Sequence, residues 1–372
     1  MNSRLRFFLS ARAATLAAAL LLATGSARAQ EPEYFEPPAP RPHFTFDWDF
    51  LARYDSITHL RIRPDIEHGR FELRPEVGFE TSDRFRLGVR AVGTLGTDGN
   101  EENPRNFDNY RSRGVSLDRY YLEAKPGRWT IRAGRFGLPL AATEMIWDRD
   151  IQTPGVGVSY ELGNPADSSV TLSAAGFRGP QRDGDRSRIG VGQVLWRRGD
   201  ESRFALEAAT SYWHIDPEDL KPHTIRQNHS VLDDGARRHL SRFRIADLLL
   251  RLHFAPGGTR VVLGLDGVRN FGARAEASAD RDAFEGSLTV GRVGTPGDWR
   301  FFYIYQYVER DAVIGAYNTD DWWFHSRYRG HRAGVAFTLL PRTFVQATGV
   351  LQRRLDLSTT LNRVMFELVK LF

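Results

Sequence analysis

The 372-residue chain contains no cysteine. Disulfide bonds are therefore excluded, and the folded chain must be stabilised by other means. Lysine is nearly absent as well, because Lys125, Lys221 and Lys370 are the only lysines among 51 basic residues. We attribute this ratio to a bias towards GC-rich codons, since no single site needs so large an excess of arginine over a whole chain.

Long apolar runs are missing too, except near the N-terminus. Residues 13–23 are apolar apart from Thr15, three arginines precede them, and Ala27 and Ala29 offer the small side chains of a cleavage site. This pattern predicts a secretory signal peptide over residues 1–29, cleaved after Ala29. A retained anchor helix is the alternative, but so short a run does not span a bilayer.

A strong charge of one sign is also lacking. The formal net charge is +5, and it falls to about +1 once the four arginines of the predicted signal peptide are removed. A protein that binds nucleic acid keeps a marked basic excess, so we expect no nucleic-acid partner. No later stretch has the composition of a membrane helix, so insertion into a membrane would require a closed barrel.

The sequence does contain a regular alternation of apolar and polar residues. Residues 30–42 are rich in proline and predict an extended periplasmic tail. From residue 43 to residue 372 the chain divides into about sixteen segments of roughly ten residues, in which every second side chain is apolar. Phe44, Phe46 and Trp48, for example, share one face of the first segment, whereas Asp47 and Asp49 share the other.

The connections between these segments alternate between short and long, which is typical of a membrane barrel with long loops at one end. We therefore predict an all-β fold, a transmembrane antiparallel β-barrel of about sixteen strands, with both ends of the mature chain in the periplasm. The predicted strands cover residues 44–53, 70–80, 84–95, 117–125, 128–134, 155–162, 168–177, 187–197, 202–213, 241–254, 259–270, 282–291, 298–308, 327–339, 343–354 and 361–372.

Several sequence stretches resemble a family of Gram-negative outer-membrane porins that is related to the phosphate-selective porins. The stretches are Gly114 to Leu122 (GVSLDRYYL), Ile131 to Pro139 (IRAGRFGLP), Trp147 to Asp150 (WDRD) and Thr153 to Val158 (TPGVGV). The last strand, in which Phe366, Leu368 and Phe372 share a face, resembles the signal read by the barrel-insertion machinery. The resemblance implies a water-filled channel in the outer membrane, contact with lipid and lipopolysaccharide, and a homotrimer.

A barrel of this size encloses an aqueous channel, so its inward positions decide what passes. Inward arginines on neighbouring strands would favour anions, whereas glutamates on the same face would pair with them and brace the wall. Both interpretations stay open at this point. The pore-lining residues that we predict are Arg74, Arg86, Arg90, Arg119, Arg132, Glu76 and Glu123.

The third long connection covers residues 135–154. In general porins the third loop folds into the barrel, and by that resemblance Asp148 and Asp150 would be its constriction charges. The alternative is an exposed loop with Trp147 packed on the barrel rim. The histidines near residues 214–240 lack the spacing of metal ligands, so we predict no metal site.

The function that this pattern favours is passive diffusion of small hydrophilic solutes, with a preference for anions if the inward arginines are not neutralised. We expect no cofactor and no catalytic residue, because the sequence contains no motif for either. Two alternatives remain. One is a barrel enzyme acting on lipids, and the other is a binding or adhesion barrel with a plugged lumen.

Overall fold

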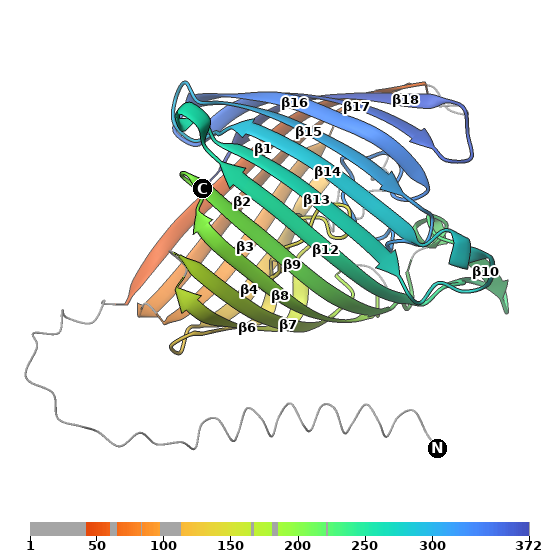
Figure 1. Ribbon diagram of the computed structural model, residues 1–372, viewed down its shortest axis with the longest axis horizontal. Coiled ribbons are helices and arrows are strands. Elements are labelled where there is room, and N and C mark those ends of the chain that lie inside the picture. The colour runs from red at the N-terminus through yellow and green to blue at the C-terminus, as the bar shows by residue number, and fades with distance from the viewer. Residues whose placement is uncertain are drawn as a thin grey trace, which may run out of the picture. The chain divides into compact units, whose positions relative to one another are not determined.

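The computed structural model describes residues 42–59, 65–82, 84–96, 113–164, 167–180, 185–220 and 222–371. These residues form a closed barrel of sixteen antiparallel strands (Figure 1). Its strands are β1 (His43–Thr58), β2 (Ile66–Ser82), β3 (Phe85–Gly96), β4 (Arg113–Ala124), β5 (Trp129–Phe136), β6 (Thr153–Asn164), β7 (Ser168–Arg178), β8 (Arg188–Asp200), β9 (Phe204–Asp216), β12 (Phe243–Phe254), β13 (Val261–Asn270), β14 (Asp282–Gly291), β15 (Trp299–Val308), β16 (Tyr328–Leu340), β17 (Thr343–Arg354) and β18 (Thr360–Lys370).

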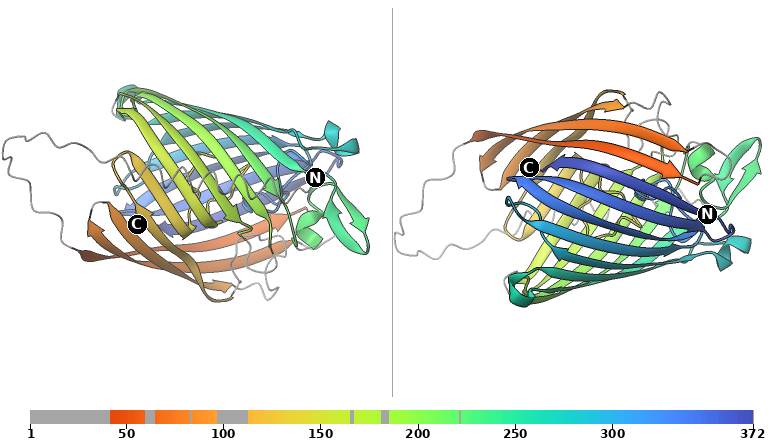
Figure 2. Two further views of the ribbon diagram at one scale, coloured as in Figure 1. Left: turned by 90° about the horizontal axis from the view of Figure 1, so that it is seen from below. Right: turned by 90° about the horizontal axis from the view of Figure 1, so that it is seen from above.

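Each strand pairs with its neighbour along the chain, and the first strand closes the barrel against the last. Tyr54 of β1 lies opposite Phe366 of β18, and Arg53 lies opposite Glu367. The right-hand view of Figure 2 shows these two strands side by side. The predicted fold class is therefore confirmed. The predicted signal peptide, most of the proline-rich tail and Phe372 lie outside the described residues.

The barrel reverses the burial pattern of a water-soluble protein. In β2, Phe71, Leu73 and Val77 are exposed, whereas the intervening Glu72 is completely buried. Phe46 of β1 is 71% exposed and Val115 of β4 is 78% exposed. An outer surface of apolar side chains around a polar interior is the arrangement of a barrel that faces lipid.

The two ends of the barrel differ in their connections. The β12–β13 connection needs only η1 (Pro256–Gly258), whereas the β9–β12 connection carries α2 (Pro222–Ile225) and a hairpin of β10 (Ser230–Asp233) and β11 (Ala236–His239). Figure 1 shows β10 at the far end of the barrel from the C-terminus. A further turn of helix, η2 (Ala275–Ala279), lies in the β13–β14 connection. No helix among the described residues is long and apolar enough to cross a membrane.

Candidate functional site in the barrel lumen

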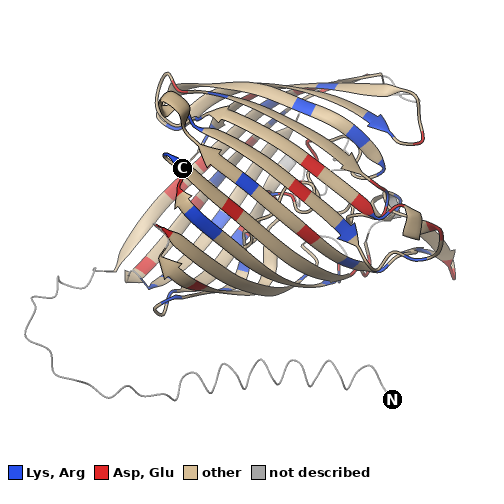
Figure 3. Ribbon diagram, in the orientation of Figure 1, with Lys and Arg blue, Asp and Glu red and all other residues tan. Residues whose placement is uncertain are grey.

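The five arginines predicted to line the pore all face the same side of β2 to β5, and each lies within 4.0 Å of a carboxylate. Figure 3 shows that charges of both signs follow the strands of the barrel. The contacts are Arg74 with Asp49 (2.9 Å) and Asp150 (2.7 Å), Arg86 with Glu76 (3.4 Å) and Asp47 (3.6 Å), Arg90 with Asp118 and with Asp49 (3.8 Å), Arg119 with Glu76 (3.9 Å), and Arg132 with Glu123 (2.5 Å). Paired charges of opposite sign leave this wall with little net field, which favours the bracing role over anion attraction.

Asp118 is a lumen residue that the alternation did not predict. The pairing of β3 with β4 shifts by one residue between Arg90 and Ala91, so that Arg119 lies opposite Arg90 while Leu117 lies opposite Ala91. Asp118 is the extra residue of this bulge, which lets two consecutive side chains reach the lumen. Its carboxylate is buried against the Arg90 guanidinium, with 2.5 Å from Arg90 Nε to the Asp118 Oδ2 atom.

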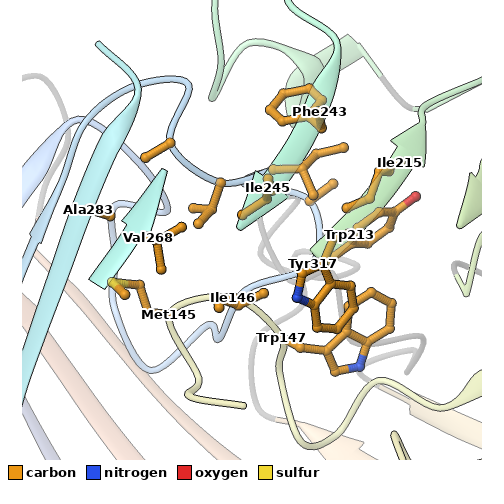
Figure 4. Packing of buried hydrophobic residues seen from close by; sticks show 14 of the residues in the cluster. Met145, Ile146, Trp147, Trp213, Ile215, Phe243, Ile245, Val268, Ala283 and Tyr317 are labelled. Atoms are coloured by element: carbon orange, nitrogen blue, oxygen red, sulfur yellow. The ribbon is translucent and has the colours of Figure 1, made fainter. Parts of the chain in front are cut away.

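The third long connection, residues 137–152, enters the barrel; we call it inner loop 1. Met145, Ile146, Trp147 and Ile151 are each no more than 3% exposed. The interpretation of an exposed loop with Trp147 on the rim is therefore wrong. Trp147 instead stacks on Trp213 of β9, with 5.9 Å between ring centroids and 16° between ring planes (Figure 4).

Polar contacts tie inner loop 1 to strands all around the barrel. The hydroxyl of Thr143 donates to Asp266 of β13 at 2.6 Å, and Arg74 of β2 donates to Asp150 at 2.7 Å. Arg332 of β16 donates to the Glu144 carboxylate at 3.0 Å. Because these strands lie far apart around the barrel, the loop crosses the lumen and narrows it.

The two predicted constriction charges differ in what they contact. The Asp148 carboxylate accepts hydrogen bonds from the backbone N–H groups of Asp150 (3.0 Å) and Asp320 (3.3 Å). Asp148 is only 6% exposed, so it holds backbone segments together rather than presenting a charge to solutes. Asp150 pairs with Arg74. Burial opposes ionisation of Asp150, but the Arg74 guanidinium outweighs it and lowers the pKa of this carboxyl below its usual range.

A second connection that the sequence did not single out also folds into the lumen. Residues 309–327, here called inner loop 2, contain the buried run Ala312, Val313 and Ile314. Asp321 of this loop pairs with Arg332 and with Arg53, whose Nη1 lies 3.0 Å from the Asp321 Oδ1 atom. Burial opposes ionisation, but these two arginines lower the pKa of Asp321 below its usual range. The loop is therefore held by paired charges.

Between the loops and the wall lies an apolar core inside the lumen. Trp213, Ile215, Phe243 and Ile245 face inward from β9 and β12 and belong to one buried cluster with apolar residues of both inner loops (Figure 4). The ring of Tyr317 from inner loop 2 lies 5.2 Å from that of Trp147. Farther along β12, Leu249 is buried on the inner face in a small cluster against which Ala141 of inner loop 1 packs, whereas Leu248 and Leu250 are exposed on the outer face, so this part of the strand is apolar on both faces.

A polar cavity of about 370 Å³ remains between inner loop 1 and the wall formed by β12 to β15. Its position in the lumen makes it the candidate path or binding site for a solute. The lining includes Thr143, Glu144 and Arg149 of the loop together with Arg251, His253, Arg260, Glu285, Ser287, Thr289 and Ile304. None of these residues was predicted, because the alternation shows which face of a strand a residue occupies but not which part of the lumen the loops leave unfilled.

The comparisons with solved structures agree with this geometry. OprB of Pseudomonas putida matches 88% of this chain and 94% of its own chain, with a TM-score of 0.59 and 11% sequence identity. A loop L8 deletion mutant of OmpT, an outer membrane protein of Vibrio cholerae, matches 88% of this chain and 99% of its own, with a TM-score of 0.50 and 10% identity.

The chain has a porin fold. No protein-family model and no curated protein matches the sequence, so the likeness is one of fold. The predicted relation to phosphate-selective porins stays a prediction.

The residues predicted to form the insertion signal lie on the outside of this porin fold. Phe366 is 54% exposed, and Leu368 borders an apolar groove of about 870 Å³ on the outer face of β1 to β3 and β16 to β18. Lys370 interrupts the apolar face, but its ammonium lies 4.5 Å from the ring centroid of Trp48. This stacking places the charge next to an aromatic ring, as expected for a lysine near a membrane interface.

Among the described residues, no group of three or more His, Asp or Glu side chains is arranged to hold a metal ion. The histidines of this region have other contacts. His214, near the end of β9, lies 3.1 Å from Asp216 of the same strand. His229 of the β9–β12 connection lies between Asp311 (3.3 Å) and Asp280 (3.6 Å), and these contacts tie the connection to two neighbouring loops.

Proposed function

We propose that this protein is an outer-membrane channel through which small hydrophilic solutes diffuse passively. One observation carries the proposal. The barrel has an apolar outer face and a charged inner face, and a polar cavity remains beside the loop that crosses its lumen. A transmembrane barrel of sixteen strands is wide enough to hold water, unlike a barrel of eight.

The two inner loops limit the size of the solute. Because they occupy much of the lumen, we expect a channel for small solutes with a modest conductance. The arginines of β2 to β5 are neutralised by carboxylates, so we do not assign a preference for anions to them. The signal peptide, contact with lipopolysaccharide, delivery by the barrel-insertion machinery and a homotrimer belong to this proposal as expectations from the porin resemblance.

A binding barrel with a plugged lumen is the second candidate, because two loops share a continuous apolar core inside this barrel. Planar bilayer recordings of the purified full chain in KCl separate the two candidates. The channel predicts steady single-channel currents. If no current rises above background, and current appears only when inner loop 2 is replaced by a short glycine-serine linker, the protein is a plugged barrel.

A further inference from the structure

Arg300 of β15 differs from the other lumen-facing arginines of the described strands, because no carboxylate oxygen lies within 4.0 Å of its guanidinium. Its Nη2 donates to the amide oxygen of Gln346 at 2.7 Å. The rings of Phe302 and Phe344 lie 5.8 and 5.6 Å from its guanidinium carbon. The aromatic rings hold the guanidinium in place, and no carboxylate of the described residues forms a direct ion pair with it, so it can still pair with the anionic group of a solute.

A second arginine reaches the same region from inner loop 1. The Arg149 side chain is 84% exposed, and its contact with Glu144 is 3.2 Å long. Glu144 is shared, because it also accepts from Arg332. Arg332 also lies 5.6 Å from the ring centroid of Phe302, the ring that Arg300 contacts. Glu144 and Phe302 therefore connect the three guanidinium groups of Arg149, Arg332 and Arg300. Like charges held close together repel, and an anion placed between them removes that cost.

The cavity beside Arg149 indicates what kind of anion fits. A volume of about 370 Å³ is at the small end for a ligand pocket and exceeds the needs of a single inorganic ion. Ser287 and Thr289 add hydroxyl groups to its wall, and Glu144 and Glu285 add carboxylates. Carboxylates accept hydrogen bonds from the hydroxyl groups of a ligand, but they repel a multiply charged anion.

The other two arginines of the cavity also have carboxylate partners. Arg260 donates to Glu201 at 3.0 Å, and Arg251 donates to Glu207 at 2.6 Å, which also accepts from Arg197. Their side chains are 47% and 29% exposed, against 84% for Arg149, so Arg149 is the cavity arginine that a solute meets most readily. A solute with one charged end and several hydroxyl groups matches this distribution.

We propose that Arg149 and Arg300 bind the carboxylate of a small hydroxylated organic anion, of the size of a sugar acid, while its hydroxyl groups occupy the cavity lined by Ser287, Thr289 and Glu285. This site rests on the proposed channel function, because the solute reaches it through the lumen. Guanidinium groups suit the role, since they donate two parallel hydrogen bonds to a carboxylate.

The test uses the purified full chain in planar bilayers at a fixed KCl concentration. Sodium gluconate is the probe, glucose is its neutral counterpart, and inorganic phosphate is the competing anion. We expect gluconate to reduce the ion current with a saturable concentration dependence. The glucose concentration needed for the same reduction should be at least about tenfold higher. Arg149→Gln and Arg300→Gln should each raise the half-inhibiting gluconate concentration about tenfold or more.

Arg132→Gln is the matched control, because Arg132 faces the lumen from the opposite wall and pairs with Glu123. It should leave the half-inhibiting concentration within about twofold of the unmodified chain. Arg149→Gln changes an exposed loop side chain, so it keeps the test decisive if Arg300→Gln does not fold.

Three results would overturn the site while leaving the channel intact. They are unsaturable inhibition by gluconate, equal inhibition by glucose, and an equal effect of Arg132→Gln. Stronger inhibition by phosphate than by gluconate would overturn the hydroxylated monoanion as the ligand class. A chain that conducts no current in KCl alone would instead contradict the proposed channel function.

Discussion

The lumen-facing charges of β2 to β5 form pairs rather than a ladder of one sign. Alternation in the sequence was enough to place Arg74, Arg86, Arg90, Arg119 and Arg132 on one face, and their ion pairs show that they share it. The alternation could not show whether these arginines attract anions or brace the wall, because that depends on which side chain lies beside each arginine on the neighbouring strand. Asp118 escaped prediction for a local reason, since a bulge adds one residue and breaks the period of two.

The Arg132 and Glu123 pair provides a direct test of bracing. Lys125 also contacts Glu123, at 2.9 Å, so these three groups together carry one net positive charge. We expect Arg132→Gln to shift the reversal potential in a KCl gradient towards cations and Glu123→Gln to shift it towards anions. The double variant keeps the same net charge as the unmodified chain and should restore its reversal potential. A double variant whose reversal potential stays far from that of the unmodified chain would contradict the paired arrangement.

His239 makes the hairpin of β10 and β11 sensitive to pH. Burial lowers the pKa of His239 from an ordinary value of 6.5 to about 4, and its ring packs edge-on against Phe243 with 5.3 Å between centroids. The opened hairpin therefore takes up a proton at a higher pH than the packed one. Packing of the hairpin should be unaffected by this group above about pH 6.5 and should weaken as the pH falls towards 4.

Hydrogen exchange measures this effect, once it is corrected for the intrinsic pH dependence of exchange. Residues 230–239 should be less protected at about pH 5 than at about pH 7.5. His239→Gln should remove the difference, whereas His214→Gln, on a histidine that contacts Asp216, should retain it. Equal protection of the hairpin at both pH values in the unmodified chain would show that His239 does not control its packing.

Strands and loops differ in how far the sequence determines them. All sixteen predicted strands are present, because each strand has its own period of two and needs no distant information. The inner loops could not be placed in this way, because their position depends on contacts with strands far away along the chain. A signal was nevertheless present. Ile245, Leu248 and Leu249 put apolar side chains on both faces of β12, which indicates packing on the inside as well as the outside.

Trp147 tests whether inner loop 1 limits the conductance. Replacing this buried indole by alanine should weaken the docking of the loop by about 3–5 kcal/mol, through lost burial and the cavity that remains. We expect Trp147→Ala to raise the single-channel conductance and the current noise, and to make the loop accessible to protease.

Trp129→Ala is the control, because Trp129 packs on Tyr160 next to a short turn, with 4.5 Å between ring centroids. It should leave conductance and noise unchanged. An unaltered conductance in Trp147→Ala would mean that the loop does not form the constriction.

The whole molecule combines two opposite solvation requirements. Its outer face must suit lipid, and its inner face must suit water and the inner loops. The composition of the chain reflects only the sum of these faces, which is why neither the net charge nor the overall content of apolar residues indicates a membrane protein. Alternation along the strands separates the two contributions, and the exposed phenylalanines and buried carboxylates of the structure confirm the separation.

Placing the same substitution on the two faces tests this assignment. Leu248 of β12 is 55% exposed on the outer face, near the middle of its strand, whereas Thr289 of β14 lines the cavity in the lumen. Leu248→Arg should lower the free energy of unfolding in lipid vesicles by about 2–4 kcal/mol, because it moves a guanidinium into the hydrocarbon core. Thr289→Arg should change it by less than about 1 kcal/mol, because the cavity is polar and has room for the side chain. Urea titrations of the refolded variants, followed by tryptophan fluorescence, measure both values. If Thr289→Arg is the more destabilising of the two, the assignment of inner and outer faces on this side of the barrel is reversed.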